Sequence, residues 1–268
     1  MITEETKIIA NYEIAKGMML MTVEAPKMAK IIKPGQFAML KVSSSLDPIL
    51  RRPLCFYTVS KHNGWVEFVY KVIGKGTEVL AERKPGEYID VLAPLGNGWT
   101  LLPDTKQIAI VGRGVGIAPL VDLAIIARQK DIQVKAYLSA GKPEFLIGRE
   151  LLQEIGCDLY LHTDDGKYGS GNKVVTDYLE KTLKEERIDQ VFTCGSKRLG
   201  KKILEYSNTY GMNSQISLEE RMGCGMGACV GCAVDIITKR GKGVKEQQRV
   251  CKEGPVFWVE EVAMLNEA

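Results

Sequence analysis

Four cysteines near the carboxyl terminus restrict this chain more than any other feature. Cys224, Cys229 and Cys232 are separated by four and then two residues, and Cys251 follows after eighteen more. This C-x4-C-x2-C…C order is the one that plant-type 2Fe-2S clusters use. Glycine occupies four positions of the same run, namely 223, 225, 227 and 231. Because a loop around a cluster needs unusual backbone angles and close approach of amides to sulfur, the sequence predicts that these cysteines are metal ligands.

Zinc is the main alternative for the four cysteines. Structural zinc sites usually contain two C-x2-4-C or H-x3-5-H pairs. This chain has one short cysteine pair, and neither of its histidines, His62 and His162, lies near it in sequence. The alternative protein class would be a zinc-stabilised, nucleotide-binding regulator without a redox role. The colour of the protein separates the two classes, since only a cluster with a flavin would make it red-brown.

The composition is that of a globular protein and gives no sign of nucleic acid or membrane partners. Hydrophobic residues make up 45% and charged residues 26%, and 36 basic and 33 acidic residues are interspersed for a net charge of +3. Such a balance produces no field of a single sign. Neither a signal peptide nor a run of about eighteen apolar residues is found. With an odd count of seven cysteines, four of them in the cluster pattern, we expect a cytoplasmic protein in a reducing compartment.

Residues 1–102 are predicted to form a small antiparallel β-barrel. Short apolar runs at 7–14, 18–23, 37–42, 56–59, 66–72 and 88–91 are the expected strands. Turn residues such as Pro34-Gly35 and Asn63-Gly64 separate them. Only residues 76–83 are expected to be helical.

Residues 103–215 are predicted to form a doubly wound α/β domain. Strands are expected at 107–111, 133–138, 158–161 and 190–194, and helices at 117–128, 145–154, 174–184 and 197–210. Regular alternation of strand and helix is typical of a parallel sheet. After a last strand at 214–218, residues 216–268 would form a C-terminal cluster segment appended to this domain. The fold class is therefore α+β multidomain, with a barrel, an α/β domain and a cluster segment.

Two segments of the α/β domain have the character of nucleotide-binding loops. Residues 112–119 place Gly112, Gly114 and Gly116 between a predicted strand and a predicted helix, where backbone amides can approach a pyrophosphate. The spacing departs from G-x-G-x-x-G, and a tight turn without a ligand is the alternative. Cys194 and Gly195 end a later strand, at the edge where such sheets bind ligands. They would flank a nicotinamide or form another turn.

The barrel contains two weaker candidates for phosphate binding. Arg51 and Arg52 precede Pro53 and a strand, although exposed arginines are more often simply solvated. Gly76 and Thr77 open the one predicted helix, where amides and a hydroxyl can hold a phosphate. The glycine-rich residues 94–99 and the acidic residues 163–166 are predicted to be turns.

Several of these stretches together resemble a known family. They are residues 52–54, 74–77, 94–98, 218–229 and 251–257, and the likeness extends from about Tyr12 to the carboxyl terminus. The chain resembles the electron-transfer subunits of NAD-dependent dihydroorotate dehydrogenase, within the ferredoxin-reductase superfamily. The resemblance implies an FAD-binding barrel, an NAD(P)-binding domain and a 2Fe-2S segment. It further implies a catalytic FMN-containing dihydroorotate dehydrogenase partner in a heterotetramer of two plus two subunits, acting in pyrimidine biosynthesis.

The resemblance also assigns residues to cofactors. The implied FAD site comprises Arg52, Pro53, Leu54, Cys55, Val69, Tyr70, Lys71, Gly76 and Thr77. The implied nucleotide site comprises Gly112, Gly114, Gly116, Cys194 and Gly195. The implied cluster ligands are Cys224, Cys229, Cys232 and Cys251. Electrons would pass from the partner through the cluster and FAD to NAD, because a flavin handles both single electrons and a hydride.

Three departures from the family pattern stand at the implied sites. Cys55 replaces a usual Ser, and as the candidate catalytic residue it would tune the flavin or be a tolerated small residue. Arg113 replaces a usual Gly, and would contact a phosphate and favour NADPH or, as we expect, point to solvent. Ser196 replaces a usual Pro. A small subunit of a related NAD(P)H:ferredoxin or sulfide-type flavin oxidoreductase is the alternative function, although bifurcating transhydrogenase subunits tend to carry Asp at the first ligand position.

Overall fold

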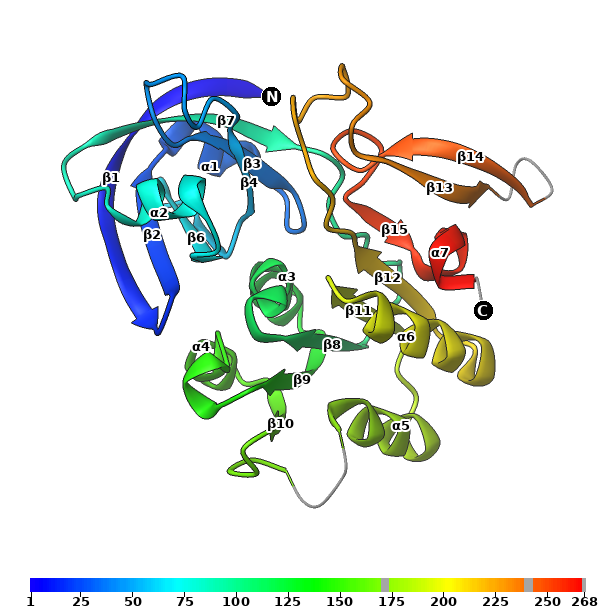
Figure 1. Ribbon diagram of the computed structural model, residues 1–268. Helices are drawn as coiled ribbons and strands as arrows, with labels where there is room; N and C mark the ends of the chain where they lie inside the picture. Colours follow the sequence, from blue (N-terminus) through cyan, green and yellow to red (C-terminus); the bar gives the residue numbers. More distant parts are fainter. Residues whose placement is uncertain (170–173, 239–242, 267–268) are drawn as a thin grey trace.

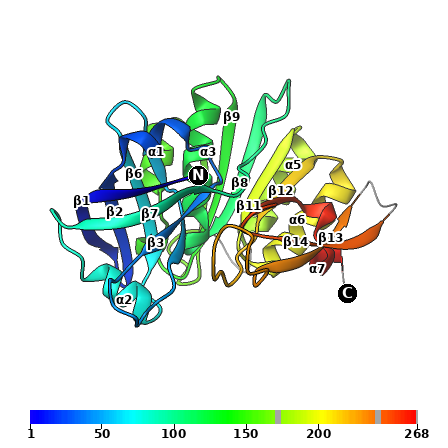
Figure 2. The ribbon, with the colours of Figure 1, turned by 90° about the horizontal axis from the view of Figure 1, so that it is seen from above.

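The computed structural model describes residues 1–169, 174–238 and 243–266. Within these ranges the chain forms a curled antiparallel sheet, a mostly parallel sheet flanked by helices, and a C-terminal segment that carries the four cysteines (Figure 1). Seen from above, the curled sheet lies at one end, β8 and β9 lie in the middle, and α6, α7 and β13 lie at the other end (Figure 2). Among the described residues, no helix is long and apolar enough to cross a membrane.

The first sheet has seven antiparallel strands in the order β4-β3-β7-β1-β2-β6-β5. They are β1 (Ile2–Ala15), β2 (Met18–Glu24), β3 (Phe37–Lys41), β4 (Arg52–Cys55), β5 (Thr58–Ser60), β6 (Trp65–Lys71) and β7 (Tyr88–Leu95). The two edge strands, β4 and β5, are joined by only Phe56 and Tyr57. Because each residue spans at most ~3.6 Å, this short link brings the edges together and curls the sheet into a barrel.

Two local predictions for the barrel were wrong. The strand expected at 56–59 is interrupted, since Phe56 leaves the ladder after β4 and packs its buried ring against Phe68 at 5.5 Å between centroids. The helix predicted at 76–83 is present as α2 (Lys75–Ala81), but a second one, α1 (Pro26–Ile31), was not predicted. α1 is only six residues long, too short to show helical periodicity, and it is held by the burial of Met28 and Ala29.

The predicted doubly wound α/β domain is confirmed. Its parallel strands are β8 (Gln107–Arg113), β9 (Gln133–Ala140), β10 (Asp158–Thr163), β11 (Gln190–Cys194) and β12 (Asn213–Ser217), in the order β10-β9-β8-β11-β12. Its helices are α3 (Ala118–Arg128), α4 (Arg149–Glu154), α5 (Val175–Glu185) and α6 (Lys197–Tyr210). α3 and α4 lie on the face toward the barrel, and α5 and α6 lie on the other face (Figure 1). The order reverses between β8 and β11, where such sheets bind ligands.

Helix α4 is shorter than the helix expected at 145–154. Its N-cap residue Gly148 has φ +75°, a left-handed conformation that separates α4 from the short 3-10 turn at Pro143–Phe145. A Cβ at Gly148 would lie 2.9 Å from Val121 Cγ2 on α3. The glycine therefore interrupts the helix and lets α3 approach closely.

The C-terminal segment is joined to the sheet of the preceding domain. It contains the hairpin β13 (Ala233–Thr238) and β14 (Val244–Arg249), then β15 (Val256–Trp258) and α7 (Ala263–Asn266). β15 pairs antiparallel with β12, with Phe257 opposite Ile216. The segment is thus more than the expected appendage, since β15 adds a strand to the sheet that was not predicted. The boundary expected at 215/216 falls inside β12.

The barrel also contacts the C-terminal segment directly. The backbone N–H of Asn97 donates to Gly254 O at 2.6 Å, and its side-chain amide donates to Glu253 O at 2.8 Å. Phe37 and Met39 of the barrel share a hydrophobic cluster with Cys232 and Val234 of the segment. The three parts therefore share apolar contacts and are not separate domains joined only by linkers.

Candidate functional site

A cavity of about 530 Å³ lies where the barrel, the α/β domain and the start of the cysteine segment meet. Predicted site residues that line it are Arg52, Pro53, Leu54, Cys55, Val69, Tyr70, Lys71, Thr77 and Cys194. Phe37 and Ile73 also line it, as do Val115, Pro119, Leu218, Glu219 and Met222, which lie in stretches singled out from the sequence but were not assigned to a cofactor. Its size and largely apolar wall suit a cofactor of flavin size.

Arg52 lies across Gly76 at one end of the cavity. A Cβ at Gly76 would stand 2.0 Å from Arg52 Nε, so only glycine leaves room for the guanidinium at the start of α2. The Thr77 hydroxyl, which was predicted to hold a phosphate, accepts from Ile73 N at 3.0 Å and donates to Gly74 O at 2.9 Å. Thr77 thus shapes the turn, and Arg52 presents the positive charge that a phosphate would meet.

Arg51 does not belong to this cavity. Its guanidinium forms a bidentate ion pair with Asp90, with Nη1–Oδ1 at 3.0 Å and Nη2–Oδ2 at 2.7 Å. The pair ties the start of β4 to β7. Of the two neighbouring arginines, therefore, only Arg52 faces the cavity.

Two thiols and a carboxylate gather at the other end of the cavity. Burial, and then the charge of Glu219, raise the pKa of Cys55 to about 12. Burial also raises the pKa of Cys194 well above its ordinary value, with Cys55 and Glu219 adding to the effect. Both side chains are consequently protonated thiols at neutral pH and can act as weak hydrogen-bond donors.

Glu219 is the clearest residue that the sequence analysis missed. A Cβ at Gly195, which has φ +90°, would stand 3.5 Å from Glu219 Oε1, so the carboxylate lies beside the turn after Cys194. Glu219 follows the carboxyl end of β12 by two residues. Its position directly after a parallel strand could have marked it as a site residue, since ligands bind at that edge of the sheet.

The glycines of residues 112–116 serve mainly close packing. A Cβ at Gly116 would stand 3.2 Å from Cys194 O, and one at Gly112 would stand 2.9 Å from Ile117 Cδ1. Gly114 has φ +53° and open space around it. Val115, Ala118 and Pro119, which follow in a 3-10 turn and the start of α3, line the cavity. The loop is thus packed against β11 at the switch point of the sheet.

Arg113 is exposed, as expected, but its guanidinium also forms an ion pair. Its Nη1 donates to Asp164 Oδ1 at 3.1 Å and its Nη2 to Asp164 Oδ2 at 2.5 Å. Asp164 lies in the predicted turn at 163–166, which the structure forms after β10. Sequence alone could not pair the two, because they are 51 positions apart.

The four cysteines of the C-terminal segment lie in two pairs. Cys224 is hydrogen-bonded to Cys229, and Cys251 to Cys232. Each iron of a 2Fe-2S cluster takes two thiolates, so a two-plus-two arrangement fits this donor set. Within the described ranges, no three His, Cys, Asp or Glu side chains converge as one tetrahedral metal ion would require.

Backbone amides surround the first of these sulfurs. Cys224 Sγ accepts from the N–H groups of Met226, Ala228 and Cys229 at 3.3–3.4 Å. Burial opposes ionisation of this thiol, but the three N–H bonds outweigh it and lower the pKa of Cys224 to about 6. The thiolate is the form that binds metal, so these N–H groups favour the ligating form of Cys224.

Glycine makes the loop possible at two positions in particular. A Cβ at Gly225, which has φ +72°, would stand 2.5 Å from Met39 Cγ on β3. A Cβ at Gly223 would stand 3.3 Å from Cys229 Sγ. The first glycine lets the loop rest on the barrel, and the second leaves space beside a sulfur.

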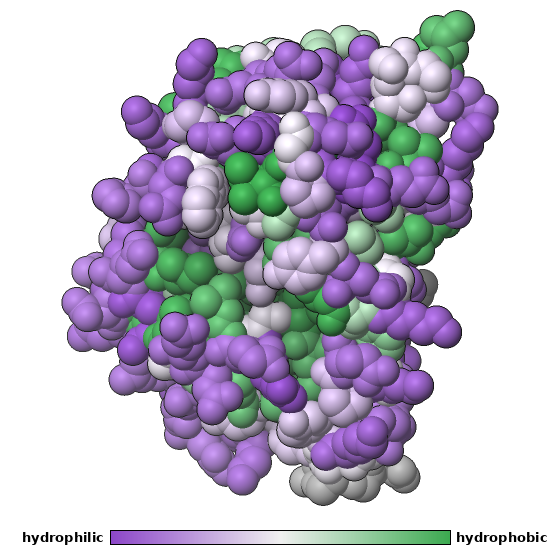
Figure 3. Space-filling view, turned by 90° about the vertical axis from the view of Figure 1, so that its left-hand side faces the viewer, coloured by the Kyte–Doolittle hydropathy of each residue, from purple (hydrophilic) through white to green (hydrophobic). Residues whose placement is uncertain are grey.

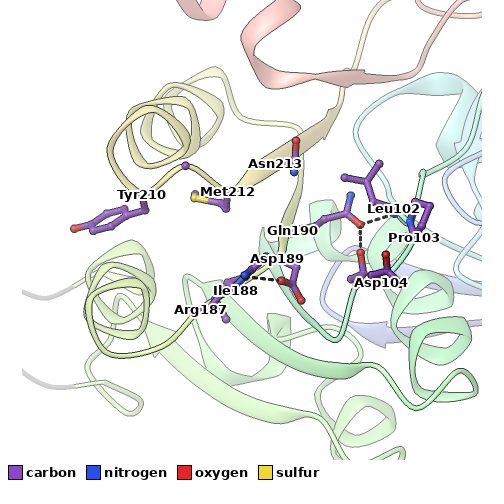
Figure 4. Close-up of a pocket in the computed structure, with 12 residues that line it drawn as sticks. Leu102, Pro103, Asp104, Arg187, Ile188, Asp189, Gln190, Tyr210, Met212 and Asn213 are labelled. Carbon is purple, nitrogen blue, oxygen red and sulfur yellow. Dashed lines mark hydrogen bonds and ion pairs between the residues drawn. The ribbon is translucent and has the colours of Figure 1, made fainter.

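Another cavity, of about 350 Å³, lies at the opposite edge of the α/β sheet. Figure 4 shows Arg187 directed toward Asp189 and Gln190 toward Leu102. The Arg187 Nε–Asp189 Oδ1 distance is 3.0 Å, and Gln190 Oε1 accepts from Leu102 N at 2.8 Å. These polar groups bond to one another and hold in place the segment around Leu102 that follows the barrel. None of the predicted site residues lines this cavity.

An apolar groove of about 450 Å³ separates the β1–β2 hairpin from α4. It is lined by Ile14, Leu20 and Tyr57 from the barrel and by residues 143–144 and 146–151 from the α/β domain. Figure 3 views the side of the molecule on which β1 and α4 lie, and hydrophobic side chains gather across its middle. The groove contains no predicted site residue either.

Comparison with protein families identifies the cysteine segment. Residues 219–263 match the family model of the iron-sulfur cluster binding domain of dihydroorotate dehydrogenase B. The match begins at Glu219, in the wall of the 530 Å³ cavity, and includes all four cysteines.

Two curated relatives match almost the whole chain. The dihydroorotate dehydrogenase B (NAD(+)) electron transfer subunit of Desulforamulus reducens is 34% identical over 94% of this chain and 95% of its own length. The subunit of the same name from Bacillus velezensis is 36% identical over 95% of this chain and 96% of its own length.

Solved structures share the architecture. An NADH-dependent reduced ferredoxin-NADP oxidoreductase has a TM-score of 0.83 and 28% identity, over 97% of this chain and 90% of that one. A ferredoxin NADP+ reductase from Neisseria gonorrhoeae with bound FAD and NADP has a TM-score of 0.66 and 20% identity, over 81% of this chain and 98% of that one. The latter likeness concerns the fold alone.

Proposed function

Because the chain belongs to the family of electron-transfer subunits of NAD(+)-dependent dihydroorotate dehydrogenase B, we propose that it carries electrons from a dihydroorotate-oxidising subunit to NAD. It is a flavin and iron-sulfur oxidoreductase subunit that uses FAD, a 2Fe-2S cluster and a pyridine nucleotide. One observation carries the proposal. Glu219–Met222 line the 530 Å³ cavity and Cys224 begins the cluster loop, so one short segment serves both redox sites.

The barrel supplies the FAD site in this proposal. Arg52, over Gly76, pairs with the phosphates, and residues 53–55 and 69–71 line the ring system. When bound, the flavin exchanges a hydride with the nucleotide and single electrons with the cluster. Phe37 and Leu218 close the apolar wall and keep water from the ring.

The nicotinamide side of the site is formed by the α/β domain. Pro119 and Cys194 line the cavity from the switch point of the sheet, next to Gly112, Gly114, Gly116 and Gly195. Cys55 and Cys194 are thiols that can donate a hydrogen bond, and Glu219 is a carboxylate that can accept one. These groups would orient the two ring systems against each other.

The cluster loop is the proposed contact with the partner. Its outer side exposes Cys229, Met226 at 47% and Val230 at 53%, so apolar side chains surround an exposed ligand. Exposed apolar residues next to a redox centre suit docking of a second protein. We place there the catalytic FMN-containing dihydroorotate dehydrogenase subunit, in a heterotetramer of two plus two subunits in the cytoplasm.

Reconstitution tests the function. The chain, mixed with the candidate catalytic subunit, is expected to reduce NAD with dihydroorotate, whereas neither subunit alone does so. Affinity capture from native extract should recover that FMN subunit. Recovery of a ferredoxin-linked flavoprotein would instead support the second candidate, which the 28% identical oxidoreductase structure favours. A colourless, zinc-containing protein would contradict both.

A further inference from the structure

The largest of the cavities considered, about 730 Å³, opens at the carboxyl ends of β8, β9 and β10. Its wall includes Arg113, Ser139, His162, Asp164, Ser196 and Arg198. It adjoins the flavin cavity, because Arg113 precedes the loop containing Val115, and Ser196 follows Cys194 by two residues. A nucleotide with its nicotinamide at Cys194 can therefore extend its adenosine into this second cavity.

The Arg113–Asp164 ion pair is the charged feature of this wall at the ends of β8 and β10. Charged side chains of α5 and α6 line the rest of it, namely Asp177, Arg198, Lys201, Lys202 and Glu205. The guanidinium and the carboxylate meet through two hydrogen bonds, at 3.1 and 2.5 Å, and both side chains are about half exposed. The hydrogen bond from Arg113 lowers the pKa of Asp164, and although burial opposes this, the charges of Arg113 and His162 add to the lowering. Asp164 thus remains a carboxylate, and the charge of Arg113 is already compensated.

The two common pyridine nucleotides differ only at the 2′ oxygen of the adenosine ribose, which is a hydroxyl in NADH and a phosphate ester in NADPH. A carboxylate accepts a hydrogen bond from the hydroxyl but repels the phosphate. A free arginine would do the reverse, because its fork binds phosphate. In this cavity, the arginine is held by the carboxylate, so a 2′-phosphate would have to break a bidentate pair.

We propose that Asp164 is a specificity-determining residue that selects NADH over NADPH, by repelling the 2′-phosphate and by holding Arg113 away from it. This rests on the proposed function of the α/β domain as the pyridine-nucleotide site. Arg113, which the sequence analysis considered as a possible NADPH contact, becomes one only when its carboxylate partner is removed.

Binding to the oxidised protein loaded with FAD and cluster tests the proposal without turnover. Calorimetric titration of the wild type is expected to give a Kd for NAD+ at least about tenfold below that for NADP+. Asp164→Asn is expected to tighten NADP+ about tenfold while changing NAD+ binding less. If Asp164→Asn fails to load FAD, Asp164→Ser removes the same charge and repeats the test.

Two further variants identify the mechanism. Asp165→Asn removes a carboxylate from the same turn, but Asp165 accepts from Lys167 N and does not line the cavity, so the NAD+/NADP+ ratio should stay as in the wild type. Adding Arg113→Ala to Asp164→Asn should abolish the gain in NADP+ binding. Flavin and cluster absorption of each variant confirms that it is folded and loaded.

Two results overturn the inference. A wild type that binds NAD+ while Asp164→Asn leaves the ratio unchanged refutes the role of Asp164 but leaves the proposed function intact. A loaded wild type that binds neither nucleotide refutes the nucleotide site itself, and with it the inference.

Discussion

The cysteine loop and the 530 Å³ cavity proposed to hold the flavin adjoin each other, yet they are built in opposite ways. Three of the four cluster ligands lie within nine consecutive positions, from Cys224 to Cys232, and backbone amides of the same stretch surround the first sulfur. The cavity is assembled from seven separate parts of the chain, from Phe37 to Pro255. A local site depends on each of its few residues, whereas a distributed one should lose function gradually when single residues change.

Loss of one ligand should have the largest effect. In Cys229→Ser, iron and acid-labile sulfide should be lost almost completely, because one iron would keep a single thiolate, while FAD stays bound in the barrel. Metal analysis and the visible spectrum measure both. Cys157→Ser is the control, because this thiol is buried against the α3 side of the sheet and should leave both cofactors in place. A full complement of iron and sulfide in Cys229→Ser would contradict the assigned ligands.

Crowding one glycine of the cavity should have a smaller, graded effect. Gly76→Ala places a methyl group 2.0 Å from Arg52 Nε, so the guanidinium must shift away from its place in the cavity. We expect the Kd for FAD to rise about tenfold, measured by fluorescence titration of the flavin-depleted protein. Gly74→Ala is the matched control, since Gly74 has extended backbone and nothing within 4 Å of a Cβ. Equal affinities in the two variants would show that Arg52 does not hold FAD.

The contribution of the barrel–α/β interface to the stability of the protein should depend on pH. Asp122 on α3 is 4% exposed, and burial raises its pKa to about 6, although Val59 N–H and Lys61 oppose this. The folded state thus binds the proton more tightly than the unfolded one, so Asp122 lowers stability progressively as pH rises from about 4 to 6.

Asp122→Asn should therefore be more stable than the wild type at pH 7.5 by roughly 1–2 kcal/mol, with a smaller gain at pH 5. Urea denaturation at the two pH values measures it. Asp235→Asn, exposed on β13, should show no such pH-dependent gain. A gain that is constant with pH would point to packing rather than ionisation.

The smallest expected effect concerns Cys55. Cys55→Ser replaces the thiol with a hydroxyl, which is a better hydrogen-bond donor. This change should shift the reduction potential of the flavin by about 10–30 mV and leave FAD bound. Spectroelectrochemical titration measures the shift, with Cys157→Ser as the control. If the potential and the spectrum of the flavin stay unchanged, Cys55 is simply a small residue tolerated at a position where the family usually has Ser.

Local patterns predicted most of the secondary-structure elements. The alternation after residue 106 predicted the parallel sheet, because hydrophobic periodicity and turn residues act over a few positions. The cysteine spacing predicted a common loop for the same reason. Short elements, such as α1 and the break at Phe56, were not predicted from local patterns. They are stabilised by tertiary burial rather than by the conformational propensity of their own residues.

The sequence by itself determined that this chain has a barrel, a doubly wound domain and a cysteine loop suited to a 2Fe-2S cluster. Only the tertiary structure decided where the charged side chains lie: Arg51 pairs with Asp90, Arg113 pairs with Asp164, and Glu219 lines the 530 Å³ cavity. The physical reason is the distance along the chain over which each kind of interaction acts. Backbone preferences are set by neighbouring residues, whereas the partner of a long charged side chain is set by whatever the packing of distant strands brings within about 3 Å.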